Sequence, residues 1–165
     1  SFDEAIVTPG IENGENWVYG DCFPAVGGLI ETPSPFKNSP PELSIFMPNH
    51  HWMDSPVELV RYVYRRDGMA SVKATYEKKK LLTKAFTFEG STLKLNFATS
   101  ARGGIYLRIL DEYNIPIEGY STYEIFGASV DRVIDFDKPL SDFAGKEVTI
   151  EFDMRDAEIY SFKFN

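Results

Sequence analysis

The stretch FTFEGSTLKLNFATSARGGIYLRI, from Phe86 to Ile109, predicts the centre of the fold. Apolar residues alternate with polar or small ones on both sides of a glycine-bearing break at Ser100–Gly104: Leu93, Leu95 and Phe97 before it, and Ile105, Leu107 and Ile109 after it. Alternation with a period of two is typical of a strand with one buried face, and a break of about five residues is typical of a hairpin loop. We therefore expect a β-hairpin at the centre of an antiparallel sheet.

A second alternating stretch lies near the C-terminus. Apolar residues occupy one face from Val148 to Met154, and after a predicted turn at Asp156–Ala157 we expect three aromatic residues to face inward: Tyr160, Phe162 and Phe164. Shorter strand-like runs precede both stretches, and only Leu140–Ala144 indicates a helical turn. About ten short strands with turns at this spacing predict an all-β protein, an antiparallel β-sandwich of jelly-roll type.

The first part of the chain differs from the rest. Ala5–Thr8 and Trp17–Gly20 predict two short strands, and residues 24–41 then contain five prolines. Proline at this density is typical of a loop or a seam between domains. We therefore expect residues 1–28 to be leading strands, either a linker or the last strands of a preceding domain, and residues 29–165 to form the β-sandwich.

Composition excludes some classes of protein. The 165 residues carry a net charge of −8, which argues against binding nucleic acid, because that binding needs basic residues to neutralise phosphates. No apolar run approaches the roughly 18 residues of a membrane helix. Cys22 is the only cysteine, so it cannot form a disulfide within the chain. Ser1 opens abruptly without a signal peptide, so we expect a mature product or a fragment, and the compartment stays open.

No catalytic motif stands out. Four acidic residues lie close together near the N-terminus: Asp3, Glu4, Glu15 and Asp21. Glycoside hydrolysis needs two carboxylates, but with 25 acidic residues in the chain such proximity is expected by chance. The only histidines are His50 and His51, and no G-x-S-x-G motif accompanies them, so nucleophilic catalysis has no support. We therefore expect no catalytic residue in this chain.

Metal binding has equally weak support. Adjacent histidines in an extended segment point to opposite faces, and no HExxH or CxxC spacing occurs. Calcium held by a loop stays open, with Asp111–Glu112 and Asp135–Asp137 as weak candidates. We favour strand-end solubility as the role of these acids and predict no cofactor.

The most informative loop is His50-His51-Trp52-Met53, which lies between Pro48 and Pro56. A tryptophan on a loop can stack on the apolar face of a sugar ring while histidines orient its hydroxyl groups. Alternatively Trp52 folds back and caps one end of the core, because large aromatic side chains usually bury most of their area. We favour the cap and keep His50, His51 and Trp52 as candidate ligand-binding residues.

Arg102, in the predicted hairpin turn, is the remaining candidate for ligand binding, with simple exposure as the alternative. Trp17 and Tyr19 would share one face of their predicted strand. For these two aromatic residues we expect packing in a core or against another domain.

Three stretches carry a resemblance to a known family: ENWVYGD (Glu15–Asp21), FEGSTLKLNFATSARGGIYLRILDE (Phe88–Glu112) and AGKEVTIEFDMRDAEIYSFKF (Ala144–Phe164). Together they resemble the C-terminal β-sandwich of large bacterial glycoside hydrolases whose catalytic part is a five-bladed propeller related to invertases and arabinanases. The resemblance implies a secreted or periplasmic protein and a catalytic domain that precedes the sandwich in the same polypeptide. It places the family's catalytic carboxylates upstream of Ser1, so no catalytic residue is carried onto this sequence.

These observations lead to three hypotheses. The first is a non-catalytic β-sandwich accessory domain of a carbohydrate-active protein, which packs on its catalytic partner and binds carbohydrate. The second is a glycoside hydrolase whose active site lies within this chain or is completed by it. The third is a structural or adhesion sandwich without a role in sugar binding. Two acidic residues that converge in one deep cleft would favour the second, and an exposed aromatic platform would favour the first.

Overall fold

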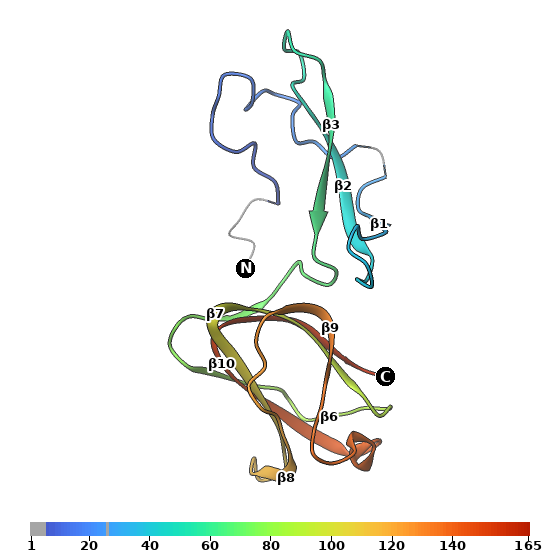
Figure 1. The fold of residues 1–165 in the computed structure, drawn as a ribbon, viewed down its shortest axis with the longest axis vertical. Coiled ribbons are helices and arrows are strands. Elements are labelled where there is room, and N and C mark those ends of the chain that lie inside the picture. Colours follow the sequence, from blue (N-terminus) through green and yellow to red (C-terminus); the bar gives the residue numbers. More distant parts are fainter. Residues whose placement is uncertain (1–5, 26) are drawn as a thin grey trace. The chain divides into compact units, whose positions relative to one another are not determined.

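The computed structural model describes residues 6–25 and 27–165, which form an all-β protein with antiparallel sheets (Figure 1). The chain divides into two compact units, Ser1–Arg66 (unit 1) and Asp67–Asn165 (unit 2). The division therefore falls at residues 66 and 67, whereas the predicted seam lies after Gly28. The assignment of residues 1–28 to a linker or a preceding domain stays a prediction.

Unit 1 is built on a small antiparallel sheet with the strand order β1-β2-β3: β1 (Ile30–Thr32), β2 (Glu42–Asn49) and β3 (Glu58–Tyr64). One arginine connects all three strands. Arg61 of β3 donates 2.8 Å hydrogen bonds to Ser44 Oγ and Glu42 Oε2 on β2 and to Thr32 Oγ1 on β1. Ser44 is fully buried, so these bonds satisfy a hydroxyl that would otherwise destabilise the sheet.

The strand predicted at Trp17–Gly20 is wrong, because residues 6–25 contain no strand. The side chain of Asn13 accepts hydrogen bonds from the amides of Glu15 and Asn16, which makes a tight turn immediately before Trp17. Trp17 itself has a φ of 64°, which an extended strand does not allow. Of the other predicted strand, Ala5–Thr8, Ala5 lies outside the described residues and the remainder is irregular.

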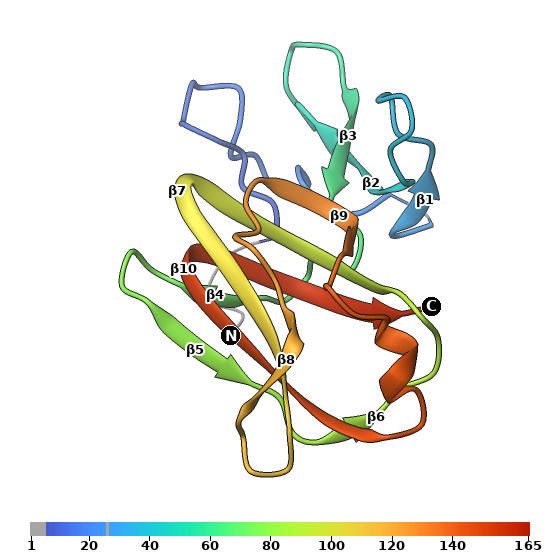
Figure 2. The same ribbon diagram turned by 60° about the horizontal axis from the view of Figure 1, so that its bottom comes forward.

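Unit 2 is a seven-stranded antiparallel sheet in which β7 and β10 are central (Figure 2). The path of paired strands is β4-β10-β7-β8, while β5 and β6 also pair with β10, and β9 pairs with β7. The strand bounds are β4 (Val72–Ala74), β5 (Lys79–Leu82), β6 (Phe86–Thr87), β7 (Leu93–Leu110), β8 (Pro116–Ser121), β9 (Ala128–Ile134) and β10 (Glu147–Phe164). The predicted helical turn is present as the 3-10 helix η1 (Leu140–Phe143).

The predicted central hairpin is wrong, because its two halves form one continuous strand of 18 residues, β7. β7 pairs with β10, also of 18 residues, from Leu93↔Phe164 to Leu110↔Thr149. The alternation was correct on both sides of the glycine-bearing break, but the break is a bend and not a turn. The completely buried apolar side chains before and after it all have odd numbers, as one period-two strand requires: Leu93, Leu95, Phe97, Ile105, Leu107 and Ile109.

The bend folds this sheet into the two layers of a sandwich. The first half of β7 pairs with the second half of β10 between β9 and β4, and the other halves pair between β8 and β5. A register shift between Arg155 and Ala157 marks the bend in β10. The turn predicted at Asp156–Ala157 is therefore wrong, because these residues lie within the continuous strand β10 at an irregularity in its pairing with β7.

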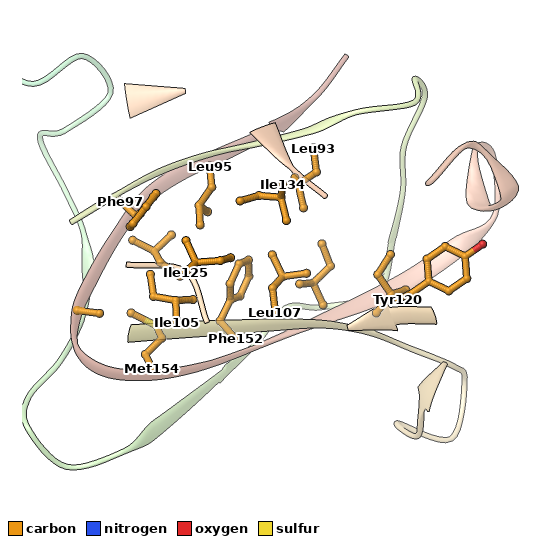
Figure 3. Packing of buried hydrophobic residues seen from close by; sticks show 14 of the residues in the cluster. Leu93, Leu95, Phe97, Ile105, Leu107, Tyr120, Ile125, Ile134, Phe152 and Met154 are labelled. Carbon is orange, nitrogen blue, oxygen red and sulfur yellow. The ribbon is translucent and has the colours of Figure 1, made fainter. Parts of the chain in front are cut away.

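The core lies between the two layers. Figure 3 shows Leu93, Leu95 and Phe97 of one layer opposite Ile105 and Leu107 of the other. All five side chains are completely buried. At about 25 cal/mol for each Å² of apolar surface removed from water, this interior supplies the main stabilisation of unit 2.

The end of β10 departs from the predicted alternation. A second register shift lies between Ile159 and Ser161, so Ile159 is buried while Tyr160 is only half-buried. The expectation that Tyr160 faces the core is therefore wrong, and Ile159 faces it instead. Phe162 is partly buried against the core, and Phe164 stacks on Phe88 with ring centroids 3.9 Å apart.

Candidate ligand-binding sites

The predicted loop in unit 1 is held in a strained conformation. His50 and Trp52 have φ values of 61° and 62°, in the left-handed region that bulky residues rarely adopt. The carboxylate of Asp21 holds the loop by accepting hydrogen bonds from the amides of His50 (3.2 Å) and His51 (2.8 Å). Residues in such backbone conformations persist where their surroundings over-determine them and concentrate at functional sites.

Trp52 lies on the surface of this loop. Its side chain is 75% exposed, so the interpretation of Trp52 as a cap on the core is wrong. The ring centroid of His51 lies 4.8 Å from that of Trp52, and the centroid of Tyr19 lies 6.3 Å away at an interplanar angle of 36°. Phe23 follows, 6.2 Å from Tyr19. We call Tyr19, Phe23, His51 and Trp52 the aromatic platform.

A glycine allows the platform to assemble. A Cβ atom on Gly20 would lie 2.7 Å from Cδ2 of His51, which is closer than side-chain contacts allow. Gly20 also has a φ of 100°, which strains any other residue. Gly20 therefore lets the segment that carries Tyr19 approach the His51 ring.

The sequence missed part of this site. For Tyr19 the sequence predicts packing in a core or against another domain; the residue is 79% exposed beside Trp52, which contradicts the core and leaves the second alternative a prediction. Asp21 was weighed as one of four catalytic acids, yet its carboxylate binds backbone amides of the loop. Asp3 and Glu4 lie outside the described residues, and Glu15 is exposed. Nothing in the local sequence indicates that Asp21 and His51, 30 residues apart, are in contact.

Arg102 lies in unit 2, at the bend where β7 and β10 turn together. It lines a cleft of about 280 Å³ with Tyr76, Arg155 and Asp156. Nη2 of Arg155 donates a 2.9 Å hydrogen bond to the carbonyl oxygen of Arg102, which connects the two strands across the cleft. Tyr76, in the connection between β4 and β5, is 77% exposed. We call this the corner cleft.

A second, smaller cleft of about 140 Å³ shares Arg155 with the corner cleft. Its lining includes Lys78, Tyr106 and two carboxylates, Glu124 and Asp153. A Cβ atom on Gly104 would collide with the Glu124 side chain, so the absence of a side chain at residue 104 leaves room for the Glu124 carboxylate. Two acidic residues therefore line one cleft, but it is the smaller of the two clefts and Glu124 is exposed.

Of the weak calcium candidates, Asp111 has a structural role. Oδ1 of Asp111 accepts hydrogen bonds from the amides of Tyr113 and Ile115, as in an Asx turn. Among residues 6–25 and 27–165, no group of three or more His, Cys, Asp or Glu side chains is placed to hold a metal ion. No helix in this part of the chain is long and apolar enough to cross a membrane.

Comparison of the chain with protein-family models, with curated proteins and with solved structures found no match.

Proposed function

We propose that this chain is a non-catalytic accessory module of a carbohydrate-active protein and that it binds glycan through the aromatic platform of unit 1. The observation that carries the proposal is the exposed ring of Trp52, held beside Tyr19 and His51 by a strained loop. An exposed indole presents apolar surface whose burial by a partner is favourable. The apolar face of a sugar ring is such a partner, and the polar edges of His51 and Tyr19 can bond to its hydroxyl groups.

The geometry of the second cleft supports a non-catalytic role. A glycoside hydrolase needs a general acid in a desolvated position and a second carboxylate placed to attack or to activate water. Glu124 is exposed to solvent, and Asp153 Oδ2 lies 4.0 Å from Nη1 of Arg108. The enzyme hypothesis can be tested at this cleft by assaying turnover of aryl glycosides and plant polysaccharides. If the chain turns over such a substrate and Glu124→Gln abolishes the activity, the binding proposal is wrong.

Binding is tested with a glycan array followed by titration of any glycan that is retained. Both tryptophans, Trp17 and Trp52, lie in unit 1, so tryptophan fluorescence reports ligand binding there directly. We expect Trp52→Ala to weaken binding about fivefold or more, because an aromatic contact contributes on the order of 1 kcal/mol beyond its buried area. The fold should stay intact, since truncating an exposed side chain changes stability by less than about 0.5 kcal/mol.

Trp17→Ala is the matched control. Trp17 is also exposed (60%) and in the same unit, but its indole donates to the carbonyl oxygen of Gly10 and is not part of the platform. Its removal should leave glycan affinity unchanged. Equal losses in both variants would point to a general change in unit 1, and unchanged binding in Trp52→Ala would contradict the proposal.

A docking role is the second candidate, and it rests on the apolar residues that the leading segment exposes. Ile11 is 92% exposed, and Trp17 and Phe23 are more than half exposed. Exposed apolar residues at this density are typical of a surface that another domain covers. The partner proposed is the catalytic domain that the family resemblance places before this chain. Ile11→Asp should then abolish association with the separately expressed upstream domain while leaving glycan binding unchanged.

A further inference from the structure

The corner cleft of unit 2 presents two arginine side chains that are not held in a close ion pair. Within residues 67–165, neither Arg102 nor Arg155 forms an ion pair with a carboxylate, although the chain contains 25 acidic residues. Asp156 also lines the cleft, so the residues of this cleft sum to two positive and one negative charge, or +1, in a chain of −8, while Glu124 and Asp153 line the adjoining second cleft together with Arg155. A local excess of positive charge on an acidic protein favours an anionic ligand.

The backbone around the cleft positions these groups. The amide of Asp156 donates a 2.6 Å hydrogen bond to the carbonyl oxygen of Thr75, which fixes the neighbouring Tyr76 relative to β10. The amide of Arg102 donates to Ser100 Oγ (3.2 Å), and the Arg102 carbonyl oxygen accepts from Arg155. The guanidinium of Arg102 makes no hydrogen bond in the described part of the chain. It is therefore free to bind a ligand with its full set of donors.

The two kinds of side chain together define the class of ligand. A guanidinium binds a carboxylate through two parallel hydrogen bonds, which a lysine cannot do. The exposed ring of Tyr76 offers an apolar face next to a phenolic hydroxyl, and the Asp156 carboxylate accepts from hydroxyl groups. A ligand that matches all three has a carboxylate, an apolar ring face and hydroxyl groups on one small ring.

We propose that the corner cleft is a binding site for a uronic acid residue of an acidic polysaccharide, with Arg102 holding the carboxylate and Tyr76 covering the sugar ring. The proposal deepens the proposed function, on which it rests for the assignment to carbohydrate, but it concerns a different unit of the chain. The second cleft is not assigned to the anion, because Glu124 and Asp153 would repel it.

The test compares an oligogalacturonide with its methyl ester, in which each carboxylate has lost its negative charge and gained a methyl group. Calorimetric titration of the whole chain should show binding of the acid and at least tenfold weaker binding of the ester. Binding of the acid should weaken as salt is added, because exposed charges are screened. Arg102→Ala should weaken it about ten- to a hundredfold, the range for loss of a hydrogen bond to a charged group.

Three variants separate the proposal from its alternatives. Arg102→Lys keeps the charge and should recover only part of the affinity, because it loses the bidentate geometry. Tyr76→Ala should weaken both the acid and the ester. Lys163→Ala removes one positive charge from an exposed site outside the cleft and should leave affinity unchanged.

Several outcomes would overturn the uronic acid site: equal affinity for acid and ester, no binding of either, or Arg102→Ala binding as the wild type does. The last outcome requires a folded Arg102→Ala variant, judged by circular dichroism, and the exposed position of Arg102 makes folding the expected result. Failure here is distinguishable from failure of the proposed function. If the corner cleft does not bind uronic acid, glycan binding at the aromatic platform would still be detected as a change in tryptophan fluorescence that depends on Trp52.

Discussion

Gly103 of β7 lies against the backbone of Asp156 in β10, and a Cβ atom at residue 103 would collide with the Asp156 carbonyl oxygen. Asp156 has a φ of 45° at this point, and β10 shifts its register there. The two long strands thus bend at a shared position, and the contact between their backbones leaves no room for a side chain. The same bend forms the wall of the corner cleft.

Gly103→Ala should destabilise unit 2 by about 1–3 kcal/mol, the usual cost of forcing an extra methyl group into a packed site. The obstacle is a backbone oxygen and not a flexible side chain, so little relaxation is available. Denaturant unfolding followed by circular dichroism measures the effect. Ala101→Ser, at an exposed position of the same bend, should be neutral, and a Gly103→Ala variant as stable as the wild type would contradict this account.

Phe97→Ala should cost about 3–5 kcal/mol, because it removes a completely buried ring from the centre of the core. That is a large part of the stability of a typical domain. The change should appear in circular dichroism and not in tryptophan fluorescence, since both tryptophans lie in unit 1. Tyr123→Ala, at an 88% exposed position of unit 2, serves as the control and should shift the midpoint little.

Glu151 should make unit 2 sensitive to acid. A hydrogen bond from Lys80 Nζ (2.9 Å), together with one from Arg108 Nη1 (2.6 Å), lowers the pKa of the Glu151 carboxyl against the opposing effect of burial. A carboxyl with a lowered pKa stabilises the fold above its unfolded pKa of about 4.5 and loses that contribution as the pH falls through the folded value. Because Lys80 is largely exposed, we expect a contribution of about 1 kcal/mol at most.

Urea unfolding of Glu151→Gln at a series of pH values tests this expectation. The variant should be less stable than the wild type at neutral pH, and the difference should shrink in acid. Glu118→Gln, an exposed glutamate on β8, should parallel the wild type throughout. A Glu151→Gln difference that stays constant from neutral to acidic pH would rule out the ionic origin.

Tyr120 should affect stability at the alkaline end. Burial, together with the hydrogen bond from its hydroxyl to Asp142 Oδ2 (2.7 Å), raises the pKa of Tyr120 from 10.0 to about 12. A raised pKa means that the neutral phenol stabilises the fold below pH 10 and that this contribution is lost as the pH rises through about 12. Tyr120→Phe should therefore remove part of the pH dependence in that window. Ultraviolet titration that shows every tyrosine ionising near pH 10 in the folded protein would contradict the assignment.

The class of fold could be predicted from the sequence. A strand with one buried face needs apolar and polar residues in alternation, and this alternation is visible between neighbouring residues of the chain. The inward positions of Leu93, Leu95, Phe97 and Ile150 were predicted correctly for that reason. β9 was missed, since Ala128–Ile134 alternates poorly and has only Ile134 fully buried. The reversal at Ile159 and Tyr160 was also hidden, because a bulge changes the face of every later residue without any mark in the hydrophobic pattern.

The composition of the two candidate binding sites depended on tertiary structure more than the class of fold did. Trp52 could be placed on a loop from its sequence, but its exposure depends on the contact between Asp21 and the amides of His50 and His51. In the sequence, Arg102 is a single arginine in a predicted turn. In the structure, the bend of β7 against β10 places it in one cleft with Arg155 and Tyr76. Local sequence determines which face of a strand is apolar, because that depends on neighbours along the chain. Which surface groups meet depends on how the strands bend and pair, and here that is decided by backbone contacts between Gly103 and Asp156, 53 residues apart.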